Sequence, residues 1–240
     1  MIGAFLNALG ILLGGLYGLV TRNPVAGSTQ NFFKMSLGCF SIFLGMYLVY
    51  INSPDTFLAS MRQLFISSVA ILLGFWGGKL LHLQHFSNRI GRYAGRLIDQ
   101  AQKNPPGTAA NGFTAATILF CAAPLGIVGA VADGTSDFFP MLGLKAVMDG
   151  MAMTIFVKMF RWPAALCAIP VFVFLYGLTV AVHFWALPWL DARHLTHSVN
   201  TTDGFLACVI ALVIFEVRRV ELANYLPALI VAPLLTSLLT

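Results

Sequence analysis

Two aspartates, Asp133 and Asp149, stand in or beside apolar stretches of the chain, and each is followed by glycine. Lys145 precedes the second aspartate by one helical turn. A carboxylate at the depth of a bilayer costs at least about 2.5 kcal/mol, so residues of this kind are candidates for binding a cation. Removal from water favours the neutral form of a carboxylic acid, so proton exchange is a second candidate chemistry.

The nearby lysine leaves two interpretations open. Lys145 and Asp149 lie on one face of a helix and can neutralise each other as a structural ion pair. Because lysine before aspartate is the less favourable order along a helix, Lys145 can instead reach Asp133 on the neighbouring helix. Asp133 can also lie at the outer mouth of the protein beside Asp137, where hydration lowers the free-energy cost of its charge.

A proline and two polar residues complete the candidate site. Pro124 removes a backbone donor in the middle of a span, and a broken helix is tolerated where its freed groups face protein or a wet cavity. Broken helices with nearby carboxylates are the usual construction of transporter sites. Asn7 and Thr117 can line such a site, although these residue types more often form packing hydrogen bonds between helices. The predicted substrate- or ion-binding residues are Asp133, Asp149, Lys145, Asn7, Thr117 and Pro124. No catalytic residue, metal site or cofactor is expected.

Composition defines the elements that must position these residues. The chain is 58% hydrophobic and 10% charged with a mean hydropathy of +0.84, whereas a soluble domain carries about 25% charged residues. The apolar runs are long enough to cross a membrane as helices. We therefore predict an all-α, polytopic helical membrane protein with about 7–8 transmembrane helices, some of them broken by proline or glycine. The spans drawn from hydropathy are 2–21, 32–51, 61–81, 112–132, 141–159, 164–186, 204–217 and 221–239.

Lysine and arginine residues set the predicted orientation, because they concentrate in cytoplasmic loops. One topology leaves only Arg62 and Arg193 outside and puts both chain termini outside. Its inner residues are Arg22, Lys34, Lys79, Arg89, Arg92, Arg96, Lys103, Lys158, Arg161, Arg218 and Arg219. The net charge of +5 therefore reflects membrane orientation, and nucleic acid is not an expected partner.

We predict one transmembrane domain over residues 1–240, with a cytoplasmic interfacial amphipathic helix and linker at 82–110. Within that segment an apolar stripe and an arginine stripe recur at helical spacing, as in helices that lie on anionic lipid. The stripes are Phe86, Ile90, Tyr93 and Leu97 on one side and Arg89, Arg92 and Arg96 on the other.

Three classes of function fit the pattern to different degrees. The leading hypothesis is a transporter or channel for a small ion or small metabolite, with the lipid bilayer as its other partner. The alternative is a structural or regulatory scaffold that forms homo-oligomers through the glycine stripe Gly10, Gly14 and Gly18. An enzyme is not expected, because the two aspartates lack the Tyr-Asp and Gly-x-Gly-Asp contexts typical of intramembrane aspartyl proteases.

A set of short motifs is spread along the chain: Asn7 with 10–15, Gly112-Phe113, Phe120-Cys121 with Pro124, Gly129 with Asp133-Gly134, Lys145 with Asp149-Gly150, and 224–229. Through these motifs the chain resembles, over almost its full length, the bacterial membrane proteins grouped as domain of unknown function 554. Asp203-Gly204 departs from an expected glycine pair. The resemblance implies a multi-pass protein of the bacterial cytoplasmic (inner) membrane and leaves its activity open.

Overall fold

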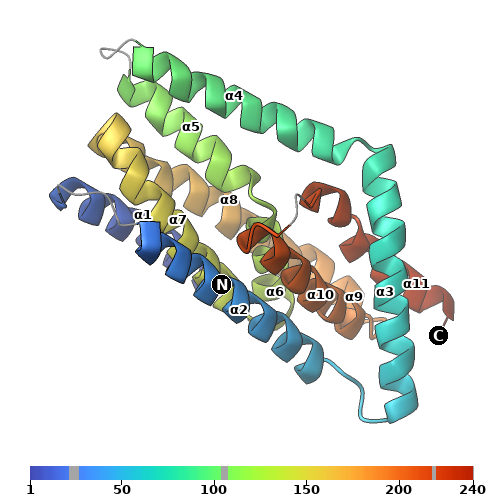
Figure 1. The fold of residues 1–240 in the computed structure, drawn as a ribbon. Helices are drawn as coiled ribbons and strands as arrows, with labels where there is room; N and C mark the ends of the chain where they lie inside the picture. Colours follow the sequence, from blue (N-terminus) through green and yellow to red (C-terminus); the bar gives the residue numbers. More distant parts are fainter. Residues whose placement is uncertain (22–26, 104–107, 218–219, 240) are drawn as a thin grey trace.

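Helices make up most of the chain that the structure describes. The computed structural model covers residues 1–21, 27–103, 108–217 and 220–239, and no strand occurs within them. The longer helices (Figure 1) are α1 (Ile2–Val20), α2 (Gly27–Ile51), α3 (Phe57–Leu80), α4 (Leu83–Lys103), α5 (Thr108–Ala122), α6 (Pro124–Ser136), α7 (Pro140–Phe160), α8 (Ala168–Ala181), α10 (Thr196–Ile214) and α11 (Ala228–Leu239). The shorter elements are η2 (Trp162–Cys167), η3 (Val182–Ala186), α9 (Leu187–Asp191) and η4 (Leu222–Tyr225).

The predicted class of helical membrane protein is confirmed. Seven helical segments of the described chain are long and apolar enough to cross a membrane, and the bent pair of α5 and α6 makes an eighth if it is one span. The segment from η2 to α9 runs through 162–191 as one such span. The orientation relative to the two sides of the membrane stays a prediction, and three of the inner cations, Arg22, Arg218 and Arg219, lie outside the described residues.

The predicted break in the fourth span lies at Pro124. Ala123 adopts an extended conformation, α6 begins with the proline in its first turn, and the axes of α5 and α6 differ by 56°. Proline suits a first helical turn because it has no N–H to leave unpaired there. The break therefore follows directly from one residue in the sequence.

The seventh span begins earlier than its hydropathy indicates. The prediction placed its start at 204, whereas α10 begins at Thr196. The added turns include Asn200, Thr201, Thr202 and Asp203, all of them buried. These side chains lower the hydropathy of a segment that is enclosed by protein, so a scale based on lipid exposure starts the span too late.

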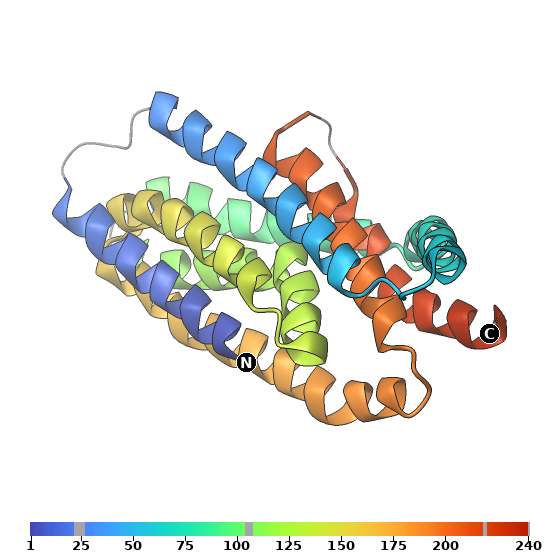
Figure 2. The same ribbon diagram turned by 90° about the horizontal axis from the view of Figure 1, so that it is seen from below.

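Two helix pairs form the closest contacts of the bundle, α1 with α7 and α2 with α10 (Figure 2). A Cβ atom added to Gly14 would lie 2.0 Å from the carbonyl oxygen of Gly150, and one added to Gly45 would lie 2.4 Å from that of Gly204. Only glycine permits this approach of two backbones. The glycine stripe of α1 is therefore used within the chain, against α7.

The segment predicted to be an interfacial helix forms α4, which lies beside α5 (Figure 1). Ala94 is buried, while Phe86 and Tyr93 of the apolar stripe are exposed. This exposure is what contact with lipid requires, but the position of α4 at a membrane surface stays a prediction. Part of the predicted linker, 104–107, lies outside the described residues.

Candidate functional site

Lys145 and Asp149 form an ion pair within α7, at the i, i+4 spacing. Both side chains are buried, and Asn7 of α1 donates a hydrogen bond of 3.1 Å from Nδ2 to Asp149 Oδ2. The lysine Nζ lies 5.8 Å from the centre of the Phe120 ring, and its stem passes close to Gly126. Of the two predicted partners of Lys145, the structure selects Asp149.

Asp133 is enclosed at the far end of α6. Its side chain is 0% exposed, and its Oδ1 lies 2.8 Å from the amino group of Met1. The backbone N–H of Gly3 donates a hydrogen bond of 3.2 Å to Oδ2. The prediction that water reaches Asp133 at an outer mouth is wrong, because α1 covers it; neighbouring Asp137 is the exposed member, with 80% of its side chain accessible.

The two aspartates thus occupy separate surroundings on α6 and α7. Each is paired with its own cation, Met1 for Asp133 and Lys145 for Asp149. Neither side chain lines the large cavity of the bundle. Their pairing explains how these charges are accommodated in an apolar protein.

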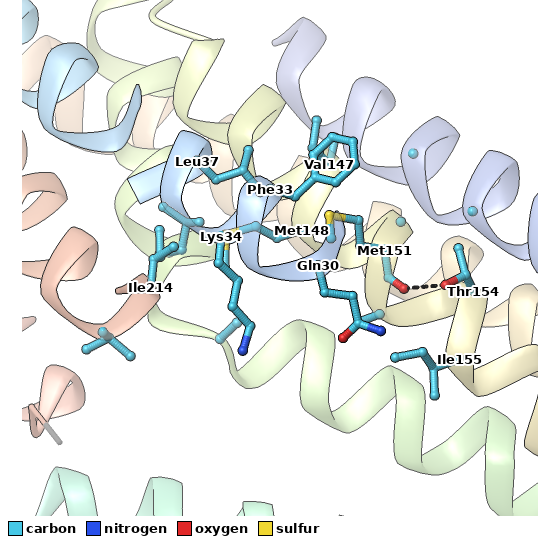
Figure 3. A pocket seen from close by; sticks show the side chains of 18 of the residues that line it. Gln30, Phe33, Lys34, Leu37, Val147, Met148, Met151, Thr154, Ile155 and Ile214 are labelled. Atoms are coloured by element: carbon cyan, nitrogen blue, oxygen red, sulfur yellow. Dashed lines mark hydrogen bonds between the residues drawn. The ribbon is translucent and has the colours of Figure 1, made fainter. Parts of the chain in front are cut away.

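That cavity has a volume of about 860 Å³ and lies between α1, α2, α7 and α10 (Figure 3). Its walls are mostly apolar, with Phe33, Val147 and Met148 among them, and Pro124 brings the helix break to its edge. At one end, Lys34 of α2 forms an exposed ion pair with Glu216. A cavity of this size and character suits a small organic molecule with a polar group at one end.

The remaining predicted site residues have different surroundings. Pro124 borders the cavity, whereas Asn7 lies at the Lys145–Asp149 pair and leaves its own Oδ1 buried without a hydrogen bond among the described residues. The Thr117 hydroxyl is likewise buried without a described partner. The six predicted residues therefore do not converge on one pocket.

Sequence reasoning missed a third buried carboxylate, Asp203 of α10. Its side chain is 0% exposed, and neither of its oxygens has a hydrogen-bond partner among the described residues. One turn earlier, Asn200 donates a hydrogen bond of 2.9 Å to Asn52 and accepts one of 2.6 Å from Thr135. The signal was present in Asp203-Gly204, the third Asp-Gly pair of the chain, but that pair stood at the boundary of the predicted span.

The fold and these buried carboxylates define a polytopic helical membrane protein with charged groups placed inside its bundle. A family model described as "Protein of unknown function (DUF554)" matches residues 2–237, so the chain belongs to that family. It is 27% identical over 239 residues to the "Uncharacterized protein YqgA" of Escherichia coli (strain K12), and 23% identical over 235 residues to the "Uncharacterized membrane protein YdfK" of Bacillus subtilis (strain 168). Each alignment covers 97% of this chain and 94% of the relative. No solved structure matches the chain significantly.

Proposed function

We propose that the protein is a membrane transporter for a small metabolite with an apolar body, and that the solute binds in the cavity between α1, α2, α7 and α10. The cavity of about 860 Å³ carries the proposal, because it combines a volume suited to one such molecule with a position at a helix break. Its apolar walls favour a metabolite over a bare ion, which needs polar ligands to replace its water.

The position of the cavity along the bundle fits one stage of a transport cycle. Its walls come from the end of α1 and the start of α2, with Tyr17 and Thr29 among the lining residues. This end of the bundle is cytoplasmic in the predicted topology, so the cavity would face the cytoplasm. At the opposite end, Asp133 and the Asn200 network fill the space between helices.

The scaffold alternative loses its main support. The stripe Gly10, Gly14 and Gly18 contacts α7 within the same chain, and the backbone approach at Gly14 leaves no room for a second subunit there. Homo-oligomers would have to form through other surfaces. The proposal assigns no catalytic role to any residue.

A substrate search in proteoliposomes tests the transport proposal. Vesicles containing the purified protein would be loaded from a bacterial metabolite extract under proton and sodium gradients, washed, and analysed by mass spectrometry. Val147→Trp fills the cavity, and Val173→Trp is its matched control on an exposed part of α8 outside the cavity. We expect the wild type and Val173→Trp to accumulate the same solute, and Val147→Trp to accumulate at least about tenfold less.

Two results would contradict parts of the proposal. If no solute accumulates above protein-free vesicles under any gradient, the protein is not a transporter of such metabolites. If Val147→Trp transports as well as Val173→Trp, the solute does not pass through this cavity.

The same proposal places the protein in the bacterial cytoplasmic membrane with both termini outside. Reporter fusions to the C-terminus test this orientation. Alkaline phosphatase, which is active only outside the cytoplasm, should be active there, and green fluorescent protein exported in unfolded form should be dark. The reverse pattern of reporter activity would mean that every loop lies on the side of the membrane opposite to the one proposed.

A further inference from the structure

Three Asp-Gly pairs share one structural position in the bundle, at a close helix crossing. Cβ atoms added to Gly134, Gly150 and Gly204 would lie 2.8, 2.7 and 2.5 Å from carbonyl oxygens of α8, α1 and α2. In each pair the glycine permits the crossing, and the aspartate beside it is buried. The three carboxylates therefore face a similar cost of removal from water.

The three differ in how their charge is compensated. Asp133 lies against the amino group of Met1, and Asp149 pairs with Lys145. Asp203 has neither an ion pair nor a hydrogen bond among the described residues. Charge compensation is thus complete for two of these sites and lacking for the third.

The surroundings of Asp203 on its own face of α10 are apolar except for Asn200, one turn earlier. Val199 stands four residues before it, where Asp149 has its lysine. Leu206 and Ile210 follow on the same face and pack in a cluster with Val128 of α6. Asn200 uses its amide group in hydrogen bonds with Asn52 and Thr135, so none of these side chains compensates the charge of Asp203.

The helices packed against α10 do not supply a positive charge that pairs with Asp203 either. Their titratable groups are Lys34, Cys39, Tyr47 and Tyr50 on α2, Arg62 and Lys79 on α3, Asp133 on α6, Asp191 on α9, and Glu221 and Tyr225 at η4, with none on α11. Asp203 forms no hydrogen bond with any of them. His197 and Cys208 are the other titratable side chains of α10.

We infer that Asp203 is a proton-binding site, neutral while the surrounding helices enclose it and able to release its proton when water reaches it. A proton compensates the charge without further ligands, whereas a metal cation requires several oxygen atoms around it. The described residues contain no group of three or more His, Cys, Asp or Glu side chains that could hold a metal ion.

A hydrogen-bonded layer lies between this site and the end of the bundle where α10 begins. Asn52, Asn200 and Thr135 connect α2, α10 and α6 one turn before Asp203. Together with Thr201 and Thr202, this layer forms a polar segment directly before the carboxyl group on α10, so a proton would enter and leave on this side. Coupling of this proton to solute movement rests on the proposed transport function.

Infrared spectroscopy of the purified full-length protein in lipid nanodiscs tests the proton site. A protonated carboxyl group gives a C=O stretching band that is distinct from carboxylate bands and shifts in D2O. At neutral pH we expect this band in the wild type and in the exposed control Asp55→Asn, and its loss in Asp203→Asn. Asp203→Glu should move the band instead of removing it, which identifies the residue even if the asparagine variant does not fold.

The outcomes separate this inference from the transport proposal. Absence of the band in the wild type, or its unchanged position in Asp203→Glu, would overturn the proton site. So would its disappearance when sodium chloride replaces choline chloride, because the site would then bind sodium. If the band behaves as expected and no solute is transported, the proton site stands and the proposed function fails.

Discussion

The buried pair on α7 allows a quantitative prediction about stability. Lys145→Met leaves Asp149 with the hydrogen bond from Asn7 and without a cation. Loss of one partner from a buried ion pair costs about 3–5 kcal/mol, and the remaining hydrogen bond places this case at the lower end. For a chain of this size about 3 kcal/mol corresponds to a fall in melting temperature of roughly 6–12 °C.

The reciprocal change is expected to have a similar effect. Asp149→Asn leaves the buried lysine without a counter-charge and with the Phe120 ring 5.8 Å away. In the double variant Lys145→Met, Asp149→Asn neither charge remains, and asparagine can still accept from Asn7. The double variant should therefore be more stable than either single variant.

A double-mutant cycle measures this coupling. Thermal unfolding of the four proteins in one detergent, repeated by reversible unfolding in mixed micelles, gives the interaction free energy of the pair. The reasoning is refuted if Lys145→Met melts within about 2 °C of the wild type. It is also refuted if the loss in the double variant equals the sum of the two single losses, since the side chains would then act independently.

Three further changes have defined expectations, each checked by the melting temperature of the purified protein. Gly14→Ala places a Cβ atom 2.0 Å from the Gly150 carbonyl and should cost about 1–3 kcal/mol or more, whereas Gly143→Ala, with open space around it, should cost nothing. Arg161→Gly should raise the melting temperature by about 2–4 °C, because φ 65° and ψ −172° is a conformation that almost only glycine adopts; no gain would mean that the loop does not hold this conformation. Asn200→Leu should cost about 1–3 kcal/mol for each group left unpaired, with unchanged helix content by circular dichroism.

Much of the fold follows from local properties of the sequence. Long apolar runs are sufficient to predict helical spans, and Pro124 alone predicts the break between α5 and α6. The start of α10 could not be predicted in this way, because its polar residues face protein instead of lipid. Hydropathy measures an average over the sides of a helix, and it cannot distinguish a buried polar side from an exposed one.

The site was less predictable than the fold, for a related reason. The i, i+4 spacing predicts Asp149 as one of two possible partners of Lys145, the other being Asp133. The enclosure of Asp133 depends on where α1 lies, and α1 is more than a hundred residues away in the chain. Asp203 was overlooked because what distinguishes it is the lack of a partner, and that is visible only when all neighbouring helices are in place.

The glycine contacts also have a mechanical consequence. Where two backbones touch with no side chain between them, the close-packed contact cannot be compressed and has little freedom to adjust. The α1–α7 and α2–α10 pairs are therefore stiff units, and the cavity lies between them. Any widening or closing of the cavity that preserves both contacts must move one helix pair as a rigid body relative to the other. The distance between two spin labels within one pair should then stay constant, while the distance between labels on different pairs should change.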